Sequence, residues 1–282
     1  HHEHPSIFKK TGLLLRYRLE QSVRQKDFYI AFICYFGALA FAVWVTNKQK
    51  FDQQGMQNIR GIVFFLFSVM LEINIMLLPS LFDDVNAFPQ QRDGGYYNAV
   101  TAIVVFLARV IIARLLFIAT TALFIYFVLT GMNELLILLG VASFVHAVLI
   151  YVVALVSTTL RSATFFAYCI EAYMIIFSGF LINMRSIPTA VAKTSILRYA
   201  YGAALNELLS GESYSCDAAY ANFNGTRPEW LPNVTSYCYT GDDYLELEGM
   251  KDDTTSANCN QMLSMAAVLL LIALARLHLV NR

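Results

Sequence analysis

The chain has 282 residues, of which 57% are hydrophobic and only 14% are charged. A soluble domain usually carries about 25% charged residues, and the mean hydropathy of this chain is +0.54. This composition excludes a typical soluble domain and indicates an integral membrane protein. Lys plus Arg and Asp plus Glu both total 20, so the net charge gives no sign of a nucleic-acid partner, and none is expected.

The first residues read HHEHPS, without Met and without a signal-peptide pattern, so the chain is expected to be a piece of a longer protein. HHEH fits a tag remnant or a loop better than a metal site, because no convincing ligand set lies nearby. Residues 1–27 mix basic side chains with Ile7, Phe8, Leu14 and Val23. This pattern is typical of an amphipathic helix that lies along the inner membrane interface and connects to the membrane domain at 28–282.

Long apolar stretches predict six membrane-spanning helices, because about 20 apolar residues cross the hydrocarbon core. The expected spans cover residues 28–46, 61–79, 106–130, 135–156, 163–182 and 262–280. The excess of Lys and Arg before the first span places the N-terminus in the cytoplasm, and the six crossings return the C-terminus there. Lys48, Lys50 and Arg60 oppose this orientation in the first outer loop. The sequence therefore predicts an all-α, multi-pass membrane protein.

The segment 183–260 is then expected to lie outside the cell, and its content agrees with that placement. Asn224 and Asn233 each begin an acceptor sequon for N-glycosylation. The same segment holds Cys216, Cys238 and Cys259, whereas Cys34 and Cys169 lie in predicted spans. Cysteines gathered in an extracytoplasmic loop indicate disulfides, although three cysteines alone do not fix a pairing.

No motif in the sequence supplies catalysis. There is no phosphate-cradling G-x-x-x-x-G-K-[ST] loop, no recognisable Ser/His/Asp triad and no metal-spaced cysteine set. The chain by itself is expected to catalyse nothing, and an enzyme embedded in the membrane is the weakest functional class.

Several stretches carry a family resemblance through their order: GMQNIRGIVFFL at 55–66, FDDVNAFPQQRDGGYY at 82–97, IYFVLTGM at 125–132, MIIFSGFLINMRSIP at 174–188, ILRYAYGAALNELL at 196–209 and YCYTGDDYL at 237–245. With the amphipathic helix before them and a large outer loop before the last span, they resemble the membrane domain of the G subfamily of ATP-binding cassette transporters. These are the half-transporters of the White and breast-cancer-resistance type. The similarity covers essentially the whole chain.

The resemblance implies a nucleotide-binding domain N-terminal to this chain, which would bind ATP and Mg²⁺ and make the full-length protein an ATP-hydrolysing translocase. It also implies a second half-transporter, as a homodimer or heterodimer, with a substrate cavity on the two-fold axis. Such a pair exports amphipathic small molecules, xenobiotics or lipids, and would lie among the lipids of the plasma membrane. Sterol or phospholipid export is the alternative within the family. An ATP-independent channel or a subunit of a sensory complex is the alternative in another class, disfavoured because only isolated polar residues occur in the spans.

Residues 82–97 are similar to the family's cytoplasmic coupling segment. Asp84 keeps one acidic residue, but Gln90 and Gln91 stand where the family usually has an Arg/His–Glu pair. Because charge-assisted bonds hold such a segment rigid, the contacts here are expected to be weaker or different. The expected coupling residues are Asp84, Phe88, Gln90, Gln91, Gly95 and Tyr97.

In the multidrug type of this family, the outer loop has one internal disulfide and one bridge across the dimer. Cys216 and Cys238 occupy the internal pair, and Asn233 stands at the position of the cross-dimer cysteine. Cys259 is left over, either as a bridge between two protomers near the axis or as an unpaired thiol.

Two arginines lie in the apolar run of the third span. Arg114 is 16 residues inside Thr130, about 24 Å at 1.5 Å per residue, near the inner interface where a guanidinium can snorkel. Arg109 lies still closer to the headgroups. Both residues fit interface anchors; alternatively, Glu72, Arg109, Arg114 and Glu171 form a polar relay between the second, third and fifth spans. His146 in the fourth span is expected to be a neutral packing residue rather than a proton carrier.

Glu72 and Glu171 lie deep in the second and fifth spans, where a charge costs at least about 2.5–3.5 kcal/mol. Either each acid pairs with Arg114 or a neighbouring helix, or both line the substrate cavity. Matched without gaps, Glu72 falls where the multidrug type has an aromatic substrate clamp, and Glu171 falls at another cavity position. Such a cavity would suit cationic amphiphiles. Its expected residues are Ser68, Val69, Glu72, Met76, Tyr168, Glu171 and Ile175, below Phe180 and Leu181, which resemble the family's bulky valve before the outer exit.

Overall fold

The computed structural model describes residues 7–24, 26–46, 53–95, 98–126, 133–214 and 240–279. Within these ranges the chain is almost entirely helical and contains no strand, which confirms the all-α prediction. The helices are α1 (Ile7–Arg24), α2 (Lys26–Thr46), α3 (Gln53–Met76), α4 (Leu78–Asp93), α5 (Ala99–Tyr126), α6 (Asn133–Val156), α7 (Leu160–Ile176), η1 (Met184–Ser186), α8 (Thr189–Ala192), α9 (Ile196–Leu209), α11 (Gly241–Glu248) and α12 (Thr255–Leu279).

Each predicted span overlaps one of the helices α2, α3, α5, α6, α7 and α12, although the bounds differ. By length and apolar composition, four described stretches can cross a membrane: Gly55–Asp93, Ala99–Ala122, Asn133–Val156 and Thr255–Leu279. In α2 the described apolar stretch is the shorter Phe32–Phe41, and α7 has 17 residues. The chain is therefore a multi-pass integral membrane protein, and the count of six crossings stays a prediction.

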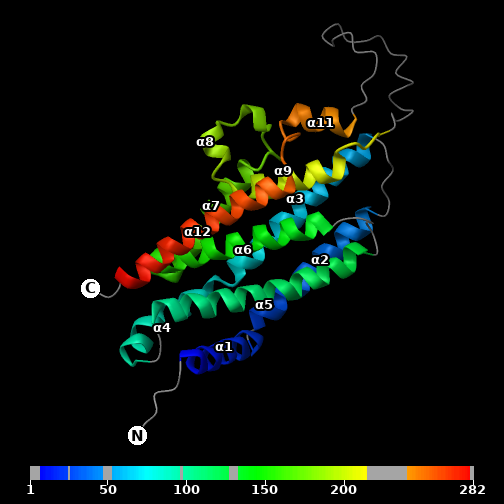
Figure 1. The fold of residues 1–282 in the computed structure, drawn as a ribbon. Helices are drawn as coiled ribbons and strands as arrows, with labels where there is room; N and C mark the ends of the chain where they lie inside the picture. Colours follow the sequence, from blue (N-terminus) through cyan, green and yellow to red (C-terminus); the bar gives the residue numbers. More distant parts are fainter. Residues whose placement is uncertain are drawn as a thin grey trace, which may run out of the picture.

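The second predicted span contains a break. Helix α3 ends at Met76, and α4 begins at Leu78 with Pro79 in its first turn. Proline is favoured there because its missing N–H would have no partner in the first turn of a helix. Helix α4 then turns aside and lies at the same end of the bundle as the C-terminal end of α12 (Figure 1).

The fifth predicted span ends early, at Ile176 rather than at residue 182. Its start is well defined, because Thr159 and Ser162 form a reciprocal capping box. After the helix, Gly179 takes φ +92°, and a Cβ there would lie 2.9 Å from the Met184 side chain. Only glycine adopts this backbone conformation without strain, so a tight turn replaces the predicted last helical turns.

The last predicted span begins early, at Thr255 rather than at residue 262. Cys259, assigned to the outer loop by its position in the sequence, therefore lies within α12 and is buried within the chain. Among the described residues, Cys34, Cys169 and Cys259 are free thiols.

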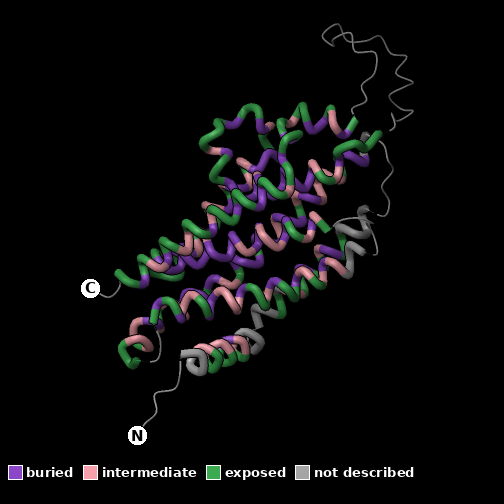
Figure 2. Tube along the Cα trace, in the orientation of Figure 1, coloured by how far each residue is buried: buried purple, intermediate pink, exposed green. Residues whose placement is uncertain are grey.

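Helix α6 lies at the centre of the bundle and packs against α3, α5, α9 and α12 (Figure 1). Leu138, Val145 and Ile150 on this helix are all 0% exposed, and buried residues recur along its whole length, in the interior of the bundle that Figure 2 shows. Lipid tails are as apolar as these side chains, so close packing rather than exclusion of water holds such helices together. The large apolar side chains on α5 and α12 remain exposed, as expected for surfaces that meet lipid or another subunit.

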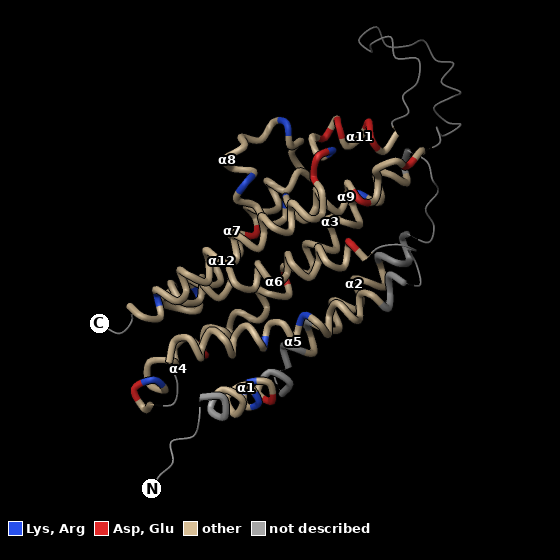
Figure 3. The backbone as a smooth tube through the Cα atoms, in the orientation of Figure 1, with Lys and Arg blue, Asp and Glu red and all other residues tan. Residues whose placement is uncertain are grey.

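Charged side chains gather at the two ends of the bundle, while most of the helical length between them is uncharged (Figure 3). One charged end includes α1 and α4, and the other includes α11 and the turns beside it. Charges are expensive at mid-membrane, so the few within the long helices mark candidate functional positions.

Candidate functional site

The two membrane acids lie together. The carboxyl group of Glu72 on α3 lies close enough to the Glu171 carboxyl group on α7 for the two to interact electrostatically. Glu171 is only 6% exposed, whereas Glu72 faces the outside of the single chain. Two carboxylates that lie this close repel each other when both are ionised, so the pair favours a cation beside it.

The other predicted cavity residues surround this pair on one face of α3 and α7. Tyr168 is 49% exposed and interacts electrostatically with both acids. Met76 is 37% exposed, while Ser68, Val69 and Ile175 are half-buried. The chain therefore presents a partly apolar surface with an acidic pair and a phenol, which together suit a ligand with a flat apolar body and a positive charge.

Arg114 contacts Asn74 rather than either acid. Its Nη2 donates a hydrogen bond to Asn74 Oδ1, and its guanidinium lies 5.9 Å from the centre of the Phe117 ring. Asn74 Nδ2 in turn lies 3.2 Å from His146 Nδ1 and 3.2 Å from the Ser143 carbonyl oxygen. Arg114, Asn74 and His146 are all buried, so they form a polar core between α3, α5 and α6. His146 is a hydrogen-bonded packing residue in this structure.

Arg109 belongs to another cluster, nearer the end of the bundle. Its Nη1 donates to Asp84 Oδ2 at 2.7 Å, and Arg18 Nη1 donates to the other carboxylate oxygen of Asp84. Arg18 Nη2 also lies 3.4 Å from Gln91 Oε1. One aspartate thus joins the amphipathic helix α1, the helix α4 of the predicted coupling segment and the span α5.

The four residues considered as a relay are consequently divided among three places. Glu72 meets Glu171, Arg114 meets Asn74, and Arg109 meets Asp84. The structure does not bring them together as one chain of hydrogen bonds. Glu72 and Asn74 are two residues apart on α3 and so point to different faces of that helix.

The remaining coupling residues are placed as follows. Phe88 is 3% exposed, while Gln90 is exposed and Gly95 takes φ +72° just after α4. Tyr97 lies outside the described residues. A small cavity of about 40 Å³ adjoins the cluster and is lined by Arg18, Asp84, Arg109 and apolar side chains that include Leu14, Phe88 and Tyr151. Gln91 on α4 therefore does make a polar contact, in which its neutral amide oxygen faces the charged Arg18 guanidinium.

The two predicted valve residues differ in their surroundings. The Phe180 ring stacks on the Phe64 ring with 4.0 Å between centroids and 8° between planes. Its carbonyl oxygen accepts a hydrogen bond from Arg60 Nη2 at 2.6 Å. Leu181 is 60% exposed. Phe180 is thus fixed within the chain, and Leu181 is free to meet another molecule.

Four predicted residues of the outer loop, Cys216, Asn224, Asn233 and Cys238, lie outside the described residues. The predicted disulfide and both predicted glycosylation sites therefore stay predictions. Within the described ranges, no three metal-ligating side chains gather in one place.

Sequence reasoning did not single out three partners that the structure shows: Arg18, Asn74 and Arg60. Asn74 was visible as the second polar residue of its span, and Arg60 as a basic residue on the side expected to be outside. For Arg18 there was no signal, because several basic residues of α1 share the same amphipathic pattern.

Comparison with known families gives one result of consequence. A family model described as an ABC-2 type transporter matches residues 10–209. The chain belongs to the ABC-2 type transporter family. The match runs from α1 to the end of α9 and so includes the acid pair, the Arg114 core and the Asp84 cluster. As an ABC-2 membrane domain, the chain is the transmembrane component of an ATP-binding cassette transporter and works with a nucleotide-binding domain. No curated protein matches the sequence.

Proposed function

We propose that this ABC-2 membrane domain belongs to a G-subfamily half-transporter of the White and breast-cancer-resistance type, and that it exports cationic amphipathic small molecules. Two half-transporters enclose the substrate cavity at their two-fold axis, in the plasma membrane, with both termini in the cytoplasm. A nucleotide-binding domain on the full-length protein binds ATP and Mg²⁺ and drives transport. The residues described above hold the substrate and form its exit.

The observation that carries this proposal is the meeting of Glu72 and Glu171 on an exposed face of α3 and α7. A buried acid that only stabilised the bundle would pair with a cation inside it, yet buried Arg114 on α5 contacts Asn74 instead. The acid pair instead lies beside exposed Tyr168 and Met76. Acids within a membrane domain usually face a cavity or a partner, and two copies of this face would place four acids around one cavity.

Transport by the full-length protein in membrane vesicles tests the proposal. We expect Glu72→Gln and Glu171→Gln to weaken the apparent affinity for a cationic amphiphile about ten-fold, because each removes a charge-assisted contact. The apparent affinity for a neutral polycyclic compound, measured in the same vesicles, should change by less than about two-fold. Substrate-free ATP hydrolysis should be retained.

Equal losses for the cationic and the neutral compound would contradict a cationic cavity and favour a structural role for the acids. Export of sterols or phospholipids that is indifferent to both substitutions would favour the lipid-exporting alternative. Flux that persists without ATP would favour a channel.

A further inference from the structure

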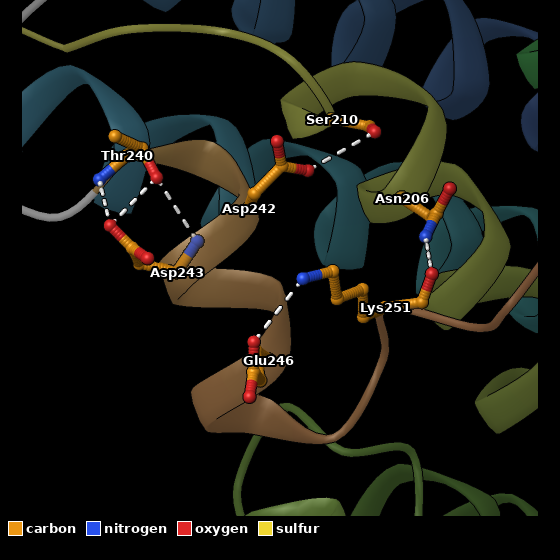
Figure 4. A network of polar contacts seen from close by, with 7 residues as sticks. All are labelled: Asn206, Ser210, Thr240, Asp242, Asp243, Glu246 and Lys251. Carbon is orange, nitrogen blue, oxygen red and sulfur yellow. Dashed lines mark hydrogen bonds and ion pairs between the residues drawn. The ribbon is translucent and has the colours of Figure 1, made fainter.

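A short helix covers one end of the bundle and is firmly docked there. Helix α11 begins with a capping box, in which Thr240 and Asp243 bond to each other's backbone N–H. The Thr240 hydroxyl group and N–H both donate to the Asp243 carboxylate and so lower the pKa of Asp243. Ser210 Oγ donates to Asp242 at 3.3 Å, and Asn206 Nδ2 donates to the Lys251 carbonyl oxygen at 2.6 Å (Figure 4). A Cβ at Gly241 would overlap the Leu209 carbonyl group. Helix α11 and the C-terminal end of α9 therefore form one rigid unit.

One arginine joins this unit to the second span. Arg60, near the start of α3, lies 3.6 Å from Glu248 Oε1 at the last residue of α11. Its Nε donates to the Tyr201 hydroxyl group on α9 at 3.2 Å. The Arg60 side chain is only 19% exposed, so these contacts are screened little by water. The same guanidinium thus contacts two elements of the docked unit.

The third contact of Arg60 is the valve segment. Its Nη2 donates to the Phe180 carbonyl oxygen at 2.6 Å, and its guanidinium carbon lies 5.2 Å from the centre of the Phe180 ring. The Phe180 ring is held from other sides by the stacked Phe64 ring and by the edge-on Tyr201 ring. Phe180 cannot move away from this position without breaking its bond to Arg60.

We propose that Arg60 is a gate-positioning residue, which holds the Phe180–Leu181 segment in its closed position and is itself oriented by Glu248 of the covering helix α11. A guanidinium has donors in a fixed planar fork, so it can serve the carboxylate, the hydroxyl group and the carbonyl oxygen together. Movement of α11 relative to α3 would withdraw Glu248, release Arg60 and free the Phe180 carbonyl group. The outer helix and the exit thereby open as one event. This inference rests on the proposed function, in which Phe180 and Leu181 form the exit valve.

The test uses the full-length protein in cell membranes, without nucleotide, with Leu181→Cys as the reporter. The rate at which a membrane-impermeant charged maleimide modifies the new cysteine from outside measures how open the exit is. Protein without the added cysteine gives the background from native thiols. We expect Arg60→Ala to raise the rate about ten-fold and Glu248→Gln about three-fold, because both weaken a charge-assisted contact. Arg60→Lys should also raise it, since one ammonium group cannot reach all three acceptors.

Glu246→Gln is the matched control, because Glu246 lies on the same helix and pairs only with exposed Lys251 at 3.2 Å. It should leave the labelling rate unchanged. A slow parental rate that stays slow in well-expressed Arg60→Lys and Glu248→Gln proteins would overturn the role of Arg60 while leaving the proposed function intact. Fast labelling in the Leu181→Cys parent itself would overturn the valve, and with it this inference. Transport by Glu248→Gln gives a further readout: a changed maximal rate with an unchanged KM supports a gate, whereas a changed KM alone contradicts it.

Discussion

At the scale of single residues, the hydrogen bonds of Asn74 decide how a buried cation is tolerated. Arg114 is 4% exposed and Asn74 is 1% exposed, so neither reaches water. Asn74 Oδ1 accepts from Arg114, and its Nδ2 faces the Ser143 carbonyl oxygen and His146 Nδ1. Because Nδ1 of His146 accepts in that bond, the proton of the neutral ring lies on Nε2. One amide thus orients an arginine on α5 and a histidine on α6.

Replacing Asn74 by Leu should therefore destabilise the domain by about 3–5 kcal/mol, because a buried guanidinium would lose its only side-chain hydrogen-bond partner among the described residues. Asn74→Asp should be less damaging, since a carboxylate still accepts from Arg114. Gln57→Leu is the control, because Gln57 is exposed on the same helix and should change stability by less than about 0.5 kcal/mol. Thermal unfolding of the purified protein in lipid nanodiscs measures all three. An unfolding temperature of Asn74→Leu equal to that of the control would contradict this account.

The same residues show how far sequence reasoning reaches at this scale. The two acids were recognisable because a carboxyl group inside an apolar run has few explanations, and their ungapped positions put them on facing helices. The hydrogen-bond partners of Arg109 and Arg114 could not be recognised from the sequence. A long flexible side chain can reach several neighbouring helices, and the rotation of α3 alone decides whether Arg114 meets Glu72 or Asn74. The spacing of apolar residues in a single sequence does not determine how α3 is rotated about its own axis.

At the scale of helices, the Asp84 cluster joins three elements that are separate in sequence. Arg18 comes from α1, Asp84 from α4 and Arg109 from α5. The side chains of Arg18 and Arg109 are 9% and 12% exposed, and both pair with the one aspartate between them. The polar link predicted to be weak at Gln90 and Gln91 is therefore provided at Asp84.

Replacement of Asp84 by Asn should loosen this junction, because two poorly solvated guanidinium groups would then lose the carboxylate that they share. We expect a loss of about 3 kcal/mol in stability and a fall in transport per ATP hydrolysed, since α1 leads toward the proposed nucleotide-binding domain. Asp93→Asn on the same helix is the matched control, as Asp93 is 68% exposed and pairs only with its neighbour Arg92. Thermal unfolding and paired ATPase and transport assays check this. Identical behaviour of the two variants would refute a special role for Asp84.

The positions of the helices could be predicted from the length of the apolar stretches, but the ends of two helices could not. The end of α7 at Ile176 is set by tertiary contacts at the turn that follows it. Gly179 can turn the chain with a positive φ, and the Met184 and Met250 side chains leave no room for a Cβ there. An isolated glycine in an apolar run reads equally well as part of a helix. The turn exists because segments far along the chain pack against it.

At the scale of the whole molecule, the buried share differs from span to span and shows which helices pack inside the bundle. About two thirds of the central apolar window of α6 is buried, 67%, against 28% for α5 and 22% for α12. In a membrane domain the outer apolar surfaces meet lipid or a second subunit rather than water. The central position of α6 was not predictable from its composition, because a lipid-facing helix and a buried one are equally apolar in sequence.

The charges at the two ends of the bundle support the proposed orientation of the molecule in the membrane. The end with α1 carries the basic segment that the positive-inside rule assigns to the cytoplasm, and the opposite end carries acidic α11 (Figure 3). Arg60, the basic residue that opposed this orientation, is paired with Glu248. An arginine neutralised by an ion pair contributes less to the charge bias, so its position agrees with an outer location.

Two cysteine substitutions of similar exposure test this orientation. Asp93 on α4 and Glu246 on α11 have side chains that are 68% and 61% exposed, so accessibility within the protein does not distinguish them. On intact cells a membrane-impermeant thiol reagent should modify Glu246→Cys, and should modify Asp93→Cys only after the membrane is permeabilised. Endoglycosidase should shorten the parent protein but not the Asn224→Gln, Asn233→Gln double variant. Labelling of Asp93→Cys in intact cells would invert the topology, and the acid pair would then face an importer's path or a different partner.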